Sequence, residues 1–120
     1  MGRKNILYSF TAINEADMSQ ASIVGQTTNV AGFDTVTYLA TWSGGQATNG
    51  DIGVETSLDE GKTWHDLDFG ATIDTDGAQD YARIVINEIG FGLIRPKYTR
   101  TNAGATGLLT MRIFGTNKGA

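Results

Sequence analysis

The chain has 120 residues, a formal net charge of −4 and no cysteine. That length suits one domain with a core of its own, and the lack of cysteine excludes disulfides, thiolate metal sites and a cysteine nucleophile. The net acidity disfavours nucleic acid as a partner. The polar residues that interrupt the N-terminal region lead us to expect neither a signal peptide nor a membrane-spanning helix. Glycine and threonine are plentiful, and good helix formers are scarce, which predicts an all-β protein.

Period-two alternation of apolar and polar residues predicts about eight short strands, bounded by turn residues. In chain order they cover residues 6–12, 21–25, 35–42, 51–56, 64–69, 81–87, 93–101 and 108–114. The clearest is 35–42, where threonines dominate one face and the other carries Val36, Tyr38, Ala40 and Trp42. Pro96 cannot donate a ladder hydrogen bond, so we expect its strand to be an edge strand or to carry a bulge. The pattern predicts a single jelly-roll-like β-sandwich over residues 1–120, with short N- and C-terminal arms.

Residues 57–64 contain the one specific motif of the chain. They resemble the Asp-box, Ser-x-Asp-x-Gly-x-Thr-Trp, at all five defining positions, Ser57, Asp59, Gly61, Thr63 and Trp64. The spacing predicts a tight β-hairpin in which Gly61 takes a positive φ and Asp59 accepts backbone N–H groups across the turn. We expect Trp64 to be mostly buried beneath that turn. The resemblance implies a structural role, because such boxes in sialidases lie away from the active site.

Other polar groups offer little chemistry. Ser57, His65 and Asp66 are close in sequence, but no nucleophile elbow accompanies them. Residues 74–80 faintly resemble a calcium loop and lack the later ligands of an EF-hand. His65 is the only histidine, and one histidine cannot form a multi-histidine metal site. We therefore expect no enzymatic activity, no cofactor and no bound metal.

The charges are unevenly distributed along the chain. Residues 51–80 contain nine acids and one base, whereas residues 81–120 contain six bases and one acid. Either neighbouring strands pair these charges within the domain, or complementary patches serve self-assembly or docking. Arg3, Lys4 and Lys118 make the chain ends basic. We expect residues 1–5 and 116–120 to contact another chain.

The order of segments from Ile6 to Gly119 resembles a known class of proteins. A Thr-Tyr-Leu-Ala-Thr-Trp-Ser-Gly strand is followed by a Gly-rich turn, the Asp-box, an Ile-Arg-Pro-Lys-Tyr-Thr-Arg-Thr strand and a final Leu-Leu-Thr-Met-Arg-Ile strand. This order resembles the small β-sandwich virion accessory proteins of tailed bacteriophages, of the head decoration or cement type. The resemblance implies a homodimer or homotrimer, made in the host cytoplasm, that clamps neighbouring coat subunits on the outer capsid surface. Its partner would be the major capsid protein or another virion protein.

Two alternatives remain open at this point. One is a carbohydrate-binding module or receptor-binding phage component, and the other is a further assembly or tail component of a phage-like machine. A sugar-stacking face could consist of Tyr38, Trp42, Trp64, Tyr81 and Tyr98. Packing of these rings in the core is the simpler interpretation.

Overall fold

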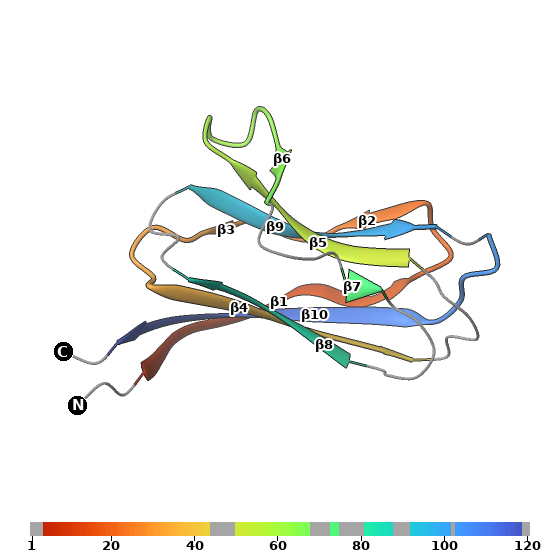
Figure 1. The fold of residues 1–120 in the computed structure, drawn as a ribbon, viewed down its shortest axis with the longest axis horizontal. Coiled ribbons are helices and arrows are strands. Elements are labelled where there is room, and N and C mark those ends of the chain that lie inside the picture. Colours follow the sequence, from red (N-terminus) through yellow and green to blue (C-terminus); the bar gives the residue numbers. More distant parts are fainter. Residues whose placement is uncertain are drawn as a thin grey trace.

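The computed structural model describes residues 4–43, 50–67, 73–74, 81–87, 92–101 and 103–118, and these form two packed antiparallel sheets (Figure 1). Sheet A contains, in spatial order, β1 (Lys4–Asp17), β10 (Leu108–Lys118), β4 (Thr35–Ser43) and β8 (Tyr81–Asn87). Sheet B contains β2 (Ser22–Val24), β9 (Leu93–Arg100), β5 (Gly50–Ser57) and β6 (His65–Asp66). Two further short strands join sheet B, β3 (Thr28–Asn29) beside β9 and β7 (Ile73–Asp74) beside β5. Within this part of the chain, no helix is present that could span a membrane.

The ten strands of the described residues occupy eight positions in a nested order. β2 and β3 both pair with β9, and β6 and β7 both pair with β5, so each couple acts as one interrupted strand. β1 pairs with β10, β2 and β3 pair with β9, β4 pairs with β8, and β5 pairs with β6 and β7. Each pair therefore encloses the next along the chain, which is the strand order of a jelly roll. The predicted all-β sandwich of about eight strands is confirmed, and the Asp-box is the innermost turn of the nest.

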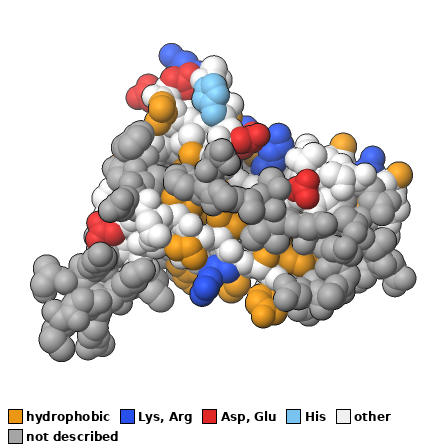
Figure 2. Space-filling model, viewed as in Figure 1, with side chains coloured by type: hydrophobic (Ala, Val, Ile, Leu, Met, Phe, Trp, Pro, Cys, Tyr) orange, Lys and Arg blue, Asp and Glu red, His pale blue; other side chains and the backbone are white. Residues whose placement is uncertain are grey.

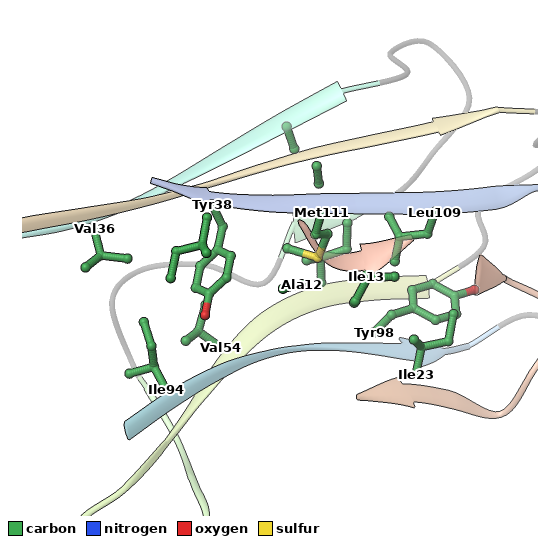
Figure 3. Packing of buried hydrophobic residues seen from close by; sticks show 14 of the residues in the cluster. Ala12, Ile13, Ile23, Val36, Tyr38, Val54, Ile94, Tyr98, Leu109 and Met111 are labelled. Atoms are coloured by element: carbon green, nitrogen blue, oxygen red, sulfur yellow. The ribbon is translucent and has the colours of Figure 1, made fainter. Parts of the chain in front are cut away.

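The core lies between the sheets and is built from the inward positions of the alternating strands (Figure 3). All four residues predicted for the inner face of β4 are buried. They pack with inward side chains of the other long strands, chiefly Ala12, Ile13, Ile52, Val54, Ile94, Tyr98, Leu109, Met111 and Ile113. Phe33 packs against this core, and its ring lies 2.9 Å from the position that a Cβ on Gly115 would take, so a larger residue there would require the ring to shift.

Pro96 lies in an interior strand, so the edge-strand alternative is wrong. β9 pairs with β5 on one side and with β2 and β3 on the other. The second ladder stops at Val24 and resumes at Thr28, so three residues of that strand face two of β9, as in a bulge. The interruption falls where proline has no N–H to donate. The N–H of Gly25 donates to the Pro96 carbonyl at 2.9 Å, and a Cβ on Gly25 would lie 2.5 Å from Pro96 Cγ.

The two chain ends lie side by side in sheet A. Lys4 is opposite Lys118 in the ladder between β1 and β10. Where the structure describes them, the predicted terminal arms are therefore paired strands, while Arg3 lies outside the described residues. Contact of Arg3, Lys4 and Lys118 with another chain stays a prediction.

Candidate functional site

The Asp-box links β5 to β6 through hydrogen bonds made inside the turn. The Ser57 hydroxyl donates to Asp59 Oδ1 at 2.8 Å and accepts the Gly61 N–H at 2.8 Å. The Asp59 carboxylate accepts the Thr63 N–H at 2.9 Å and the Thr63 hydroxyl at 2.5 Å. Gly61 has a φ of 92° after Glu60 at 64°. Both the positive φ and the role of Asp59 are as predicted.

In these contacts the Ser57 hydroxyl and the Asp59 carboxylate, the two groups of the turn that could take part in catalysis, hydrogen-bond within the turn itself. Hydrogen bonds from Thr63, its hydroxyl first, hold the pKa of Asp59 at about 2, so the carboxylate stays ionised and bonded within the turn. The Ser57 hydroxyl donates to Asp59 and makes no described bond to His65. His65 and Asp66 are both exposed. A nucleophile–base hydrogen bond is therefore not formed in this hairpin. No cluster of metal-ligating side chains occurs within the described ranges.

Trp64 is partly buried against the turn, in line with the prediction that it is mostly buried there. Its indole N–H donates to the Gly61 carbonyl at 3.1 Å, which holds the ring against the turn. The guanidinium carbon of Arg95 lies 3.9 Å from the ring centroid, a cation–π contact. The eight-residue turn is too small to enclose the indole, and β9 supplies the remaining cover.

Arg95 also joins Trp64 to an ion-pair cluster that sequence reasoning missed. Glu55 of β5 lies opposite Arg95 of β9, with Oε1 2.9 Å from Nε, and its Oε2 is 3.5 Å from Lys97 Nζ. Glu55 is only 8% exposed. The cluster pairs the acidic segment 51–80 with the basic segment 81–120 inside the domain, as one of the two interpretations predicted. Arg95 and Lys97, two residues apart on one strand face, were the available signal.

The outer face of sheet A contains a second group of basic residues. Arg83 of β8, Leu39 of β4 and Arg112 of β10 form one cross-strand row. Val85, Thr37 and Phe114 form the next row. We call these six residues the arginine face. Leu39, Thr37 and Phe114 are half-buried, and Val85 is 40% exposed.

The arginine face lacks acidic partners within the described chain. β4, β8 and β10 contain no aspartate or glutamate, and neither Arg83 nor Arg112 forms an ion pair with a described carboxylate. Arg112 instead donates to the hydroxyls of Thr11 and Ser9 at 2.7 and 2.8 Å. In Figure 2 a basic side chain lies among hydrophobic ones over sheet A, low in the view, whereas acidic and basic side chains mix over sheet B, above.

The aromatic residues do not form a row on the surface. Tyr38, Trp42 and Tyr98 are buried in the core, where Figure 3 shows the two tyrosines between the sheets. Trp64 and Tyr81 reach solvent, but Trp64 lies beside sheet B and Tyr81 is on β8 of sheet A. The five aromatic residues considered from the sequence therefore do not form a common sugar-stacking face.

No protein-family model matches the chain, and no curated protein matches it. Among solved structures, it is similar to TmCBM61 in complex with β-1,4-galactotriose, with 17% identity, a TM-score of 0.44 and coverage of 89% of this chain and 68% of that one. It is also similar to dimeric latent PorU from Porphyromonas gingivalis, with 10% identity, a TM-score of 0.44 and coverage of 92% of this chain and 12% of that one. Similarity at this level carries no inference about function.

Proposed function

We propose that this chain is a non-enzymatic virion structural protein that docks onto coat subunits of a tailed-bacteriophage capsid through the arginine face. The observation that supports the proposal is the row in which Arg83 and Arg112 flank Leu39 on three strands, β8, β4 and β10, that contain no carboxylate. Protein interfaces combine apolar contacts with arginine and are depleted in acidic residues. An acidic surface on the coat protein would complete the charges.

The composition of this face keeps the cost of docking low. Thr37 and Val85 are β-branched and already restricted at χ1, and Leu39 and Phe114 are half-buried in the sheet. Few rotamers are therefore lost when a partner covers them. The two guanidinium groups can form bidentate contacts with carboxylates. Jelly rolls also occur in viral capsid and lectin domains, an analogy of fold only.

The primary test is association with particles. We expect the chain to co-sediment with virions released by cells that carry its gene, and to be labelled on their surface by specific antibody. Binding should weaken as salt rises, because surface charges are screened. Absence of the chain from purified virions would overturn the proposal.

Charge reversal identifies the docking face. Arg112→Glu and, separately, Arg83→Glu should abolish recovery of the chain with virions. Lys62→Glu is the matched control, because it makes the same charge change at an exposed position in the Asp-box turn. Equal binding by Arg112→Glu and Lys62→Glu would exclude the arginine face as the contact.

A second candidate function is carbohydrate binding at the outer face of sheet B. It is favoured by the partly exposed Trp64 ring, which lies against Arg95, itself paired with Glu55, because sugar sites combine an aromatic ring with a few placed polar groups. Arg95 already covers one face of the ring. Binding in an oligosaccharide panel that Trp64→Phe weakens and Arg112→Glu leaves unchanged would support this candidate over capsid docking.

A further inference from the structure

Three of the four sheet edges in the described part of the chain are short or irregular. β1 forms one edge of sheet A, and its ladder with β10 shifts register at three places. The Gln26 N–H also donates to the Ala12 carbonyl of β1 at 3.0 Å, which occupies part of that edge. The edges of sheet B consist of strands of two or three residues. Bulges, short strands and covering segments are the means by which proteins prevent unwanted strand pairing.

The fourth edge, β8, has none of these features. Its seven residues pair with β4 in an unbroken register from Asn87 to Tyr81, and no described strand lies on its other side. Its sequence, Tyr-Ala-Arg-Ile-Val-Ile-Asn, contains no glycine, proline or lysine and one charged residue. Tyr81 and Val85 are 57% and 40% exposed. A regular, apolar edge of this kind is a template for another strand.

We propose that β8 pairs antiparallel with β8 of a second copy of this chain, so that sheet A continues across a two-fold axis. A two-fold axis through Val85 sets Val85 opposite itself and Arg83 opposite Asn87 of the partner subunit. A cross-strand pair of β-branched residues is stabilising. The Asn87 amide oxygen accepts the Thr35 hydroxyl at 3.1 Å, and its second lone pair can accept a hydrogen bond from Arg83 of the other copy. The two copies of Arg83 are then four residues apart along the strands, about 13 Å.

Charge disfavours the register centred on Arg83 and is compatible with a closed dimer centred on Val85. An axis through Arg83 would place two guanidinium groups directly opposite each other, which is destabilising. At about 13 Å their repulsion is largely screened, since the Debye length is about 8 Å at physiological salt. The two-fold contact is isologous, so each copy uses its β8 edge once and no fibre grows.

The dimer would also enlarge the proposed docking surface, a consequence that rests on the proposed function. In the dimer, the β8 edges join the sheet A of one copy to the sheet A of the other. The arginine faces of the two copies then become neighbours on one continuous surface. Simultaneous docking of both faces to adjacent coat subunits would strengthen binding without any new contact. The pairing of β8 itself is tested without virions.

Cysteine cross-linking tests the register directly, because the natural chain has no cysteine. Opposed cross-strand residues have Cα atoms about 4.5–5.5 Å apart, within the range that a disulfide spans. Val85→Cys should form a disulfide-linked dimer under mild oxidation. Leu108→Cys, which is 43% exposed on β10, should remain a monomer in denaturing gels. Equal cross-linking of the two variants would overturn the proposed register.

Sedimentation equilibrium of the unmodified chain tests the dimer itself. We expect a monomer–dimer equilibrium in the micromolar range, abolished by Val85→Lys and retained by Leu108→Lys, with unchanged far-ultraviolet circular dichroism in both. A chain that stays monomeric into the millimolar range, or a dimer that Val85→Lys leaves intact, would overturn the inference. Neither result would contradict docking through the arginine face, because that proposal is tested separately by the loss of virion recovery in Arg112→Glu, and Arg112 lies on β10 rather than β8.

Discussion

On the outer face of sheet B, Glu55 lies between Arg95 and Lys97 and bonds both. On the outer face of sheet A, Arg83 and Arg112 flank Leu39 and form no ion pair with a described carboxylate. The jelly-roll order accounts for the difference. It places β5, from the acidic segment, beside β9, from the basic segment, whereas β8 and β10 both lie beside β4, which carries no charge. One outer face therefore pairs oppositely charged residues within the domain, whereas the two arginines of the other face have no described carboxylate partner.

The largest stability loss should occur on the sheet B side. Trp64→Ala removes the indole that packs against the Asp-box turn and under Arg95, and should cost about 3 kcal/mol of unfolding free energy, at the low end for large aromatic deletions because the ring is half-buried. Urea unfolding gives the value. Trp64→Phe should cost less, since a ring is retained. A cost under about 1 kcal/mol in Trp64→Ala would show that the hairpin does not depend on the ring.

Glu55→Gln tests whether the ion pairs of Glu55 with Arg95 and Lys97 stabilise the fold. The change leaves Arg95 and Lys97 without their carboxylate and should cost about 2 kcal/mol, reduced from the value for fully buried pairs because both cations are partly exposed. The cost should fall as salt is added. A double-mutant cycle with Arg95→Gln isolates the Glu55–Arg95 coupling. A coupling of zero would remove the distinction between the two outer faces.

The two buried tyrosines extend the comparison to the inner faces. Tyr98 of sheet B donates from its hydroxyl to the Met18 carbonyl at 2.9 Å, so Tyr98→Phe should cost about 1 kcal/mol. Tyr38 of sheet A is fully buried with no described partner for its hydroxyl, and burial raises its pKa. Tyr38→Phe removes an unsatisfied group and should be neutral or stabilising by up to about 1 kcal/mol. Thermal unfolding should therefore show a lower melting temperature for Tyr98→Phe, and an unchanged or higher melting temperature for Tyr38→Phe.

The pH dependence of stability reports on the Asp-box. The pKa of Asp59 is lowered from 3.8 to about 2 in the folded chain. Its contribution is therefore complete above the unfolded pKa and is lost as pH falls from about 4 through about 2. Asp59→Asn should have a lower melting temperature than the unmodified chain at neutral pH, and the difference should shrink over this acid range. A constant difference down to pH 2 would contradict the assigned hydrogen bonds.

The smallest change in stability is expected for a substitution on the outer face of sheet A. Arg112→Gln removes a charge that has no described acidic partner, and the exposed side chain bonds only hydroxyl groups among the described residues. Stability should change by less than about 0.5 kcal/mol, while recovery with virions should fall. Denaturant unfolding of Arg112→Gln and of Glu55→Gln under the same conditions compares the stability cost of a substitution on each outer face. A cost equal to that of Glu55→Gln would make both faces structural.

Local chemistry by itself determined the long strands and the Asp-box turn, whereas the two-residue strands β3 and β7 were not predicted. Alternation places Val36, Tyr38 and Trp42 on one face of β4, because successive side chains of a strand point to opposite sides. The Asp-box closes on itself within eight residues, so Asp59 and Gly61 take the predicted roles without help from the rest of the chain. These features depend on neighbours along the sequence.

Only the tertiary structure decided which strands lie side by side. Pro96 predicts an irregularity, and the nested order places it in the neighbouring strand, between Val24 and Thr28. Glu55 meets Arg95 across forty residues of sequence, and Arg95 then covers Trp64. Alternation specifies which way a side chain points and carries no information on which strand will be its neighbour. That choice follows from burying both sheets against one core, and it separates the paired charges of sheet B from the arginines of sheet A.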